Sequence, residues 1–218
     1  MVEKRLRSTL VNASAVLLAS DFNISIFKPL WLTSNDILQE DDFGEGTLIS
    51  PAAIQVPSRS FDLLIMPNRL QMVLKRPTQE SQAELLRVIG GVAKTLPHVP
   101  YTGIGLNFGY LVPAPDGTDF FAWSTAKFSA SWASLVVSPH DTAARFGSYL
   151  SYDFMAMRLK IDIKPTRQQE SSDLMLAEFN YHLDLKQPGA TDQVLEALQK
   201  WRAAIKHTFE VVNLLEAQ

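Results

Sequence analysis

The sequence predicts an α+β fold with a predominantly antiparallel sheet, and two kinds of pattern support this prediction. Over residues 155–163 and 175–185, apolar side chains alternate with charged and polar ones, which is typical of strands with one buried and one wet face. Over about 78–96 and 191–215, apolar residues recur at steps of three and four, which indicates amphipathic helices. The two strands flank a polar loop, so we expect them to pair antiparallel.

The order of elements repeats along the chain. The residues before about 98 and those after about 99 each read as strand, insertion, strand, hairpin and helix. This layout predicts a single domain over 1–218 with two pseudo-repeated ββββα halves, about 8–98 and 99–218. The eight strands would form one sheet, with both long helices on one sheet face. A single irregular α+β domain without internal symmetry is the alternative.

Composition and charge exclude several classes of protein. The chain has 218 residues, of which 46% are hydrophobic and 20% charged, and this excludes a disordered protein. Its 20 basic and 23 acidic side chains give a net charge of −3, whereas proteins that neutralise nucleic-acid phosphates usually have a basic excess. The lack of cysteine excludes disulfides and cysteine-ligated metals. We therefore do not expect a nucleic-acid partner.

The apolar stretch near the start is interpreted as a strand. Residues 13–19 are apolar, but the stretch is short for a signal peptide and is interrupted by Asn12 and Ser14. A transmembrane helix needs about 20 apolar residues, and no run in the sequence approaches that length. These observations predict a cytoplasmic protein with no membrane contact.

The glycine-rich segment 103–109 resembles a phosphate-binding loop in composition only. Its G-x-G-x-x-x-G spacing differs from the dinucleotide signature, and the chain continues as a strand where a helix should begin. Alternation places three glycines and Asn107 on one strand face, which therefore lacks bulky side chains. Such a face lets a helix or a ligand approach the backbone closely, and we expect a helix to pack there, with Gly90 and Gly91 of the first helix as its counterpart.

No metal or cofactor is predicted. The acidic segment 40–46 lacks the ligand spacing of a calcium loop, so we expect a solvated turn there. The four histidines include no H-x-H or H-E-x-x-H pair, so they predict no zinc site. The sequence also contains neither a G-x-S-x-G nucleophile elbow nor a Walker loop.

The best acid–base group lies on the strand over 175–185. Glu178 and His182 share its polar face, because alternate residues of a strand point to the same side. Arg158 and Lys160 of the partner strand are expected to lie opposite acidic residues. If the protein is an enzyme, His182 and Glu178 would be its catalytic candidates, and Arg158 and Lys160 would bind a small anionic metabolite. A wet face with routine charge pairs is the alternative.

Aromatic residues concentrate in and beside the two insertions, 21–47 and 114–129. Residues 22–31 read F-N-x-x-I-F-x-P-x-W, and here the chain resembles a family of uncharacterised bacterial proteins with this segment after the first strand. The resemblance covers about a dozen residues and implies no catalytic residue. The segment is expected to anchor a short helix against the sheet through Phe27 and Trp31, or else to form a partner-binding patch.

The lack of a compact catalytic motif and the aromatic insertions favour a non-catalytic binding or assembly protein over an enzyme. Large apolar side chains in loops must bury against the fold, a neighbouring subunit or a partner, and aromatic residues dominate interface energetics. We therefore predict a homo-oligomer or a protein partner. The alternatives are an enzyme acting on a small anionic metabolite at the polar sheet face, and nucleic-acid binding by a saddle-like sheet. The candidate contact residues are Phe27, Trp31, Phe121, Trp123 and Trp132.

Overall fold

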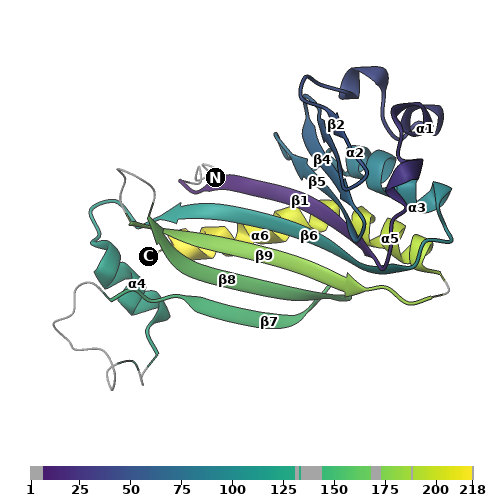
Figure 1. The fold of residues 1–218 in the computed structure, drawn as a ribbon. Helices are drawn as coiled ribbons and strands as arrows, with labels where there is room; N and C mark the ends of the chain where they lie inside the picture. The colour runs from purple at the N-terminus through teal and green to yellow at the C-terminus, as the bar shows by residue number, and fades with distance from the viewer. Residues whose placement is uncertain (1–6, 131–132, 134–143, 168–172, 188, 218) are drawn as a thin grey trace.

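The fold is an α+β arrangement around one antiparallel sheet, as the alternation predicts (Figure 1). The computed structural model describes residues 7–130, 133, 144–167, 173–187 and 189–217. Within them, nine strands pair in the order β2-β3-β4-β5-β1-β6-β9-β8-β7. The strands are β1 (Thr9–Ala19), β2 (Leu48–Ile49), β3 (Ile54–Pro57), β4 (Phe61–Met66), β5 (Arg69–Leu74), β6 (Tyr101–Pro113), β7 (Ser148–Phe154), β8 (Met157–Arg167) and β9 (Asp173–Asp184).

The helices are shorter and more segmented than the sequence predicts. They are η1 (Ile24–Ile26), α1 (Pro29–Ser34), η2 (Glu40–Asp42), α2 (Gln82–Leu85), the π-helical η3 (Leu86–Gly90), α3 (Gly91–Thr95), α4 (Phe120–Phe128), α5 (Ala190–Gln199) and α6 (Trp201–Glu216). The helix expected over 78–96 is therefore the continuous run α2–η3–α3, and the one expected over 191–215 is divided into α5 and α6. None of the helices among the described residues is long and apolar enough to cross a membrane.

β1 and β6 are neighbours at the centre of the sheet, and the strands follow in a similar order on either side of them. Outward from β1 the neighbours are β5, β4 and β3, and outward from β6 they are β9, β8 and β7. Such an order is what two ββββα units joined at their first strands would give, and the internal duplication itself stays a prediction. The expectation of eight strands is wrong, because β2 adds a short ninth strand to the edge beside β3.

Both helical runs cover the same face of the sheet, with α5 and α6 behind β6 and β9 (Figure 1). The indole of Trp201 on α6 packs on Phe108 of β6 with ring centroids 4.7 Å apart, and both side chains are buried. Trp201 Nε1 also donates a hydrogen bond of 2.9 Å to the Thr78 carbonyl. Trp201 therefore connects the second helical run to the sheet and to the segment that precedes the first helical run.

The prediction that a helix packs on the glycine face is wrong. The buried side chains of Ile104, Leu106 and Phe108 face the helices, so the glycines on alternate positions face the opposite, open side. Burying these large apolar side chains stabilises the fold far more than covering glycines would, at roughly 25 cal/mol per Å² of apolar surface. The expected counterparts, Gly90 and Gly91, pack instead against side chains of α5 and against Ile37.

A two-residue turn joins β7 to β8. Met155 and Ala156 have φ angles of 54° and 55°, and Phe154 pairs with Met157 across the turn. Positive φ at both central residues is the type I′ geometry that matches the twist of a tight hairpin. The sequence prediction placed Met155 inside the strand, so it missed this turn.

Candidate functional site

The predicted acid–base face is present, but its charges are arranged differently. Register places Arg158 opposite His182 and Lys160 opposite Asn180, so the expectation that both bases face acidic residues is wrong. Arg158 instead contacts Asp153 of β7 at 3.2 Å, and His182 Nε2 lies 3.0 Å from the exposed Asp184 carboxylate.

Glu178, the second catalytic candidate, is engaged in a separate cluster. Its carboxylate pairs with Lys164, which also contacts Asp162 at 3.3 Å. The hydrogen bonds that Lys164 donates to Glu178 and to Asp162 raise the pKa of its ammonium group. His182 pairs with Asp184 instead, so the two candidates belong to different clusters. This arrangement supports the wet-face interpretation over a catalytic one.

The open sheet face contains a polar hollow of ≈ 450 Å³ that extends across strands β1, β5, β6, β7, β8 and β9. Its floor includes Ser14, Asn107 and Asn180, and the Asn180 amide donates a 2.5 Å hydrogen bond to the Asn107 side-chain oxygen. Lys160 and Arg69 also line the hollow, whereas Arg158 does not.

Sequence reasoning missed Arg69 as a candidate. This residue opens β5 directly after the Pro67–Asn68 turn, and nothing in its local sequence connects it with the strand that carries Lys160. The two cations line one hollow although β1, β6 and β9 lie between β5 and β8.

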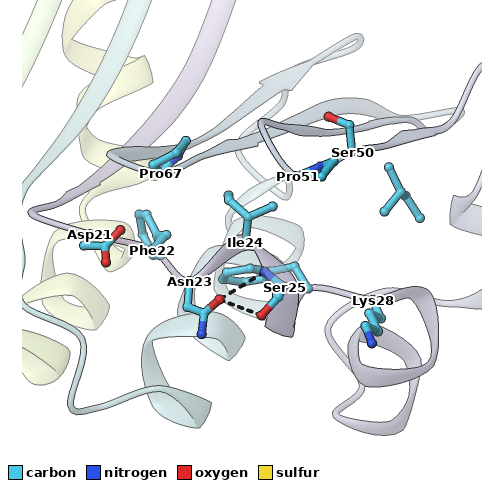
Figure 2. Close-up of a pocket in the computed structure, with 11 residues that line it drawn as sticks. Asp21, Phe22, Asn23, Ile24, Ser25, Lys28, Ser50, Pro51 and Pro67 are labelled. Atoms are coloured by element: carbon cyan, nitrogen blue, oxygen red, sulfur yellow. Dashed lines mark hydrogen bonds between the residues drawn. The ribbon is translucent and has the colours of Figure 1, made fainter.

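A second, larger hollow of ≈ 600 Å³ lies beside the aromatic segment (Figure 2). Its polar side chains include Asp21, Asn23, Ser25 and Lys28. The Asn23 side-chain oxygen accepts hydrogen bonds from the Ser25 N–H at 3.2 Å and the Ser25 hydroxyl at 2.6 Å. Asn23 thus caps the short helix η1, which is the structural role expected of this residue type.

The aromatic contact candidates divide between the interior and the surface. Phe27 and Trp123 are buried, which argues against a direct partner contact at these two positions. Trp31 is half-buried on α1, and its ring meets Phe27 edge-on at 5.4 Å, so the segment anchors a short helix as expected. Phe121 is half-buried beside Phe146. Trp132 lies outside the described residues.

The acidic segment 40–46 is more than a solvated turn. Asp42 is buried, and its carboxylate pairs with Arg87 at 2.9 Å and accepts a hydrogen bond from Ser58 at 3.0 Å. Because the sequence gives no sign that Arg87 approaches, the turn prediction is wrong for this residue. No group of three His, Asp or Glu side chains among the described residues is placed to hold a metal ion.

The sheet exposes apolar side chains at both of its edge strands, and β7, with seven residues, is longer than the two-residue β2. Tyr149, Leu150 and Tyr152 are 60%, 50% and 38% exposed, and β7 pairs only with β8 among the described strands. An edge strand with unpaired backbone groups and few charges is a template for pairing with another chain.

Comparison with known proteins gives no relative from which a role could be transferred: no protein-family model matches this chain, and no curated protein matches it significantly. The resemblance in the aromatic segment therefore stays a prediction.

Proposed function

We propose that this chain is a cytoplasmic, non-catalytic binding or assembly protein that self-associates through the free edge of β7. The observation that carries the proposal is the exposed, apolar and unpaired edge itself. Most soluble homo-oligomers are two-fold symmetric dimers, so a second copy of β7 running antiparallel is the partner to consider first.

The backbone of β7 supports such pairing. In a two-residue hairpin, the pair that closes the turn is hydrogen-bonded, and here this pair is Phe154 and Met157. Because hydrogen-bonded and non-hydrogen-bonded pairs alternate along an antiparallel ladder, the backbone groups of Tyr149, Ser151 and Asp153 point away from β8. These residues are centred on Ser151, so a two-fold axis there brings each outward group opposite a partner.

The side chains of β7 also fit a second copy. Leu150 and Tyr152 share the helix-side face with Ile161 and Leu159, their partners on β8, but both are partly exposed. A two-fold axis at Ser151 places Leu150 opposite the partner's Tyr152, and an apolar–aromatic cross-strand pair contributes roughly 0.2–1 kcal/mol. On the other face, Tyr149 lies opposite the partner's Asp153, so no like charges meet.

Sedimentation velocity of the purified chain tests the proposal. We expect a concentration-dependent dimer, and we expect Leu150→Lys to shift it to monomer because two lysines would be buried at the symmetric contact. Leu30→Lys is the matched control, since Leu30 is exposed. It lies on the helix α1, which is far from β7 in the sequence and is not part of the sheet. A strictly monomeric wild type, or a dimer that survives Leu150→Lys, overturns the proposal.

Backbone pairing is tested separately at Ser151. Ser151→Pro removes an N–H that points away from β8, so it should weaken the dimer without breaking the β7–β8 ladder. Ser151→Thr keeps the N–H and should leave the dimer intact. In hydrogen exchange, the amides of Tyr149, Ser151 and Asp153 should gain protection as the protein concentration rises, and unchanged exchange would contradict edge pairing.

A further inference from the structure

Of the charged side chains that line the hollow on the open sheet face, the acidic ones are paired within the described part of the chain and the basic ones are not. Asp162 and Glu178 at its margin both contact Lys164, so the two carboxylates are partly neutralised. Lys160 and Arg69 also line the hollow, and neither forms an ion pair or side-chain hydrogen bond with any described residue. These two cationic side chains of the hollow therefore have no charged or hydrogen-bonding partner among the described residues.

Arg69 is the more constrained of these cations. Its side chain is half-buried, and its Nε is buried without a hydrogen-bond partner among the described residues. A buried donor on a charged group costs free energy unless it is hydrogen-bonded. A guanidinium held in this way is satisfied by an anionic acceptor, which it can bind in bidentate geometry.

The surface between the two cations is polar and recessed. Ser14 and Gln71 lie on the Arg69 side and Asn180 on the Lys160 side, with Asn107 between them. Gly105 and Gly109 flank Asn107 on the same face of β6, so no bulky side chain stands beside it. Hydroxyl and amide groups at this position can hydrogen-bond the uncharged part of a ligand.

We infer that the open sheet face is a binding site for a small molecule that carries two anionic groups, carboxylate or phosphate. The Arg69 guanidinium and the Lys160 ammonium attract its anionic groups, and the amides of Asn107 and Asn180 hydrogen-bond its polar part. The hollow of ≈ 450 Å³ is large enough for such a molecule. Leu150 and Tyr152 lie on the opposite face, and Tyr149 is the residue of β7 that lines the hollow.

Isothermal titration calorimetry with citrate and with inorganic pyrophosphate tests this inference, with neutral sorbitol as a reference. We expect saturable binding of at least one of the two anions and no binding of sorbitol. Arg69→Gln and Lys160→Gln should each weaken that binding about tenfold, because each removes one charge-assisted contact. Arg158→Gln is the matched control, since it removes a charge from the same face outside the hollow.

Three results would overturn the site: no saturable binding of either anion at millimolar concentration, binding that Arg69→Gln and Lys160→Gln leave unchanged, or equal weakening by Arg158→Gln. A measurement on the wild type guards against a variant that fails to fold. In proton–nitrogen correlation spectra, the side-chain amides of Asn107 and Asn180 should shift on titration with the anion that binds. Amide signals that do not move would equally refute the assignment.

Discussion

The phenol oxygen of Tyr181 on β9 lies 2.8 Å from Nδ1 of His207 on α6, so this pair joins the sheet to the helix layer. Phe154 stacks on the same imidazole, with centroids 4.0 Å apart and planes 24° apart. Burial lowers the pKa of His207, with Glu210 acting in the opposite direction, and burial raises the pKa of Tyr181. The Tyr181 hydroxyl also donates a hydrogen bond of 3.3 Å to the Ala204 carbonyl, and the tautomer of the neutral imidazole decides which group donates in the Tyr181–His207 pair.

The lowered pKa of His207 predicts a pH dependence of stability. The unfolded chain takes up a proton at its ordinary histidine value, about 6.5, before the folded chain does. The stabilisation is therefore complete above this value and decreases as the pH falls below it. In urea denaturation, we expect the free energy of unfolding to decrease between about pH 7 and about pH 5, and to decrease less in His207→Gln.

Other groups of the protein also change stability with pH, so the test is the comparison between variants. His98 is exposed in the loop between α3 and β6, and His98→Gln should lose stability with pH as the wild type does. An identical pH dependence in His207→Gln and wild type would show that the imidazole does not contribute.

The alternating and helical patterns of apolar residues correctly predicted those strands and helices that bury one face and expose the other. The strand over 175–185 and the helix over 191–215 correspond to β9 and to α5 with α6, because each pattern is a local property of its own segment. The glycine strand was placed the wrong way round. Its apolar face meets the helices, and the prediction was wrong because it gave close approach to the glycine backbone more weight than burial of large apolar side chains.

The candidate site was less predictable, because it depends on residues that are distant in the sequence. Lys160 was identified from its own strand, but Arg69 joins it only after the intervening strands pair in register. The β7 edge was missed for a different reason. Its turn uses positive φ at Met155 and Ala156, and residues of these types rarely adopt that conformation, so the sequence contains no turn signal.

The ion pair between Asp42 and Arg87 should stabilise the first half of the fold. The Asp42 carboxylate also accepts hydrogen bonds from Ser58 and from the backbone N–H of Gln39. We expect Asp42→Ala to lower the free energy of unfolding by about 2–3 kcal/mol, because it leaves the partly buried guanidinium without its partner. Asp41→Ala, at the exposed neighbouring position, should change it by less than ~0.5 kcal/mol. Equal effects in chemical denaturation would contradict this role.

The buried contact between Tyr110 of β6 and Thr208 of α6 is suited to a double-mutant cycle. Their hydroxyl oxygens lie 3.0 Å apart, and the Thr208 hydroxyl also lies 2.9 Å from the Ile205 carbonyl, so Tyr110 is the donor in the pair. Thr208→Val should cost about 1–2 kcal/mol, because it leaves the Tyr110 hydroxyl buried without an acceptor. Adding Tyr110→Phe should recover most of that loss, and strictly additive costs would show that the two hydroxyls are not coupled.

Glycine is required at position 44 by a close approach of backbone, and not by a special backbone angle. A Cβ there would overlap the carbonyl oxygen of Pro57 at the end of β3, whereas a Cβ at Gly105 would meet its nearest neighbours at an ordinary 3.7 Å. Gly44→Ala should therefore lower the free energy of unfolding by about 2 kcal/mol. Gly105→Ala should be neutral or stabilise by up to about 1 kcal/mol, because alanine restricts the unfolded chain. The same denaturation experiment measures both, and a Gly44→Ala protein as stable as wild type would mean that the 44–57 contact is looser than the packing of this loop on β3 implies.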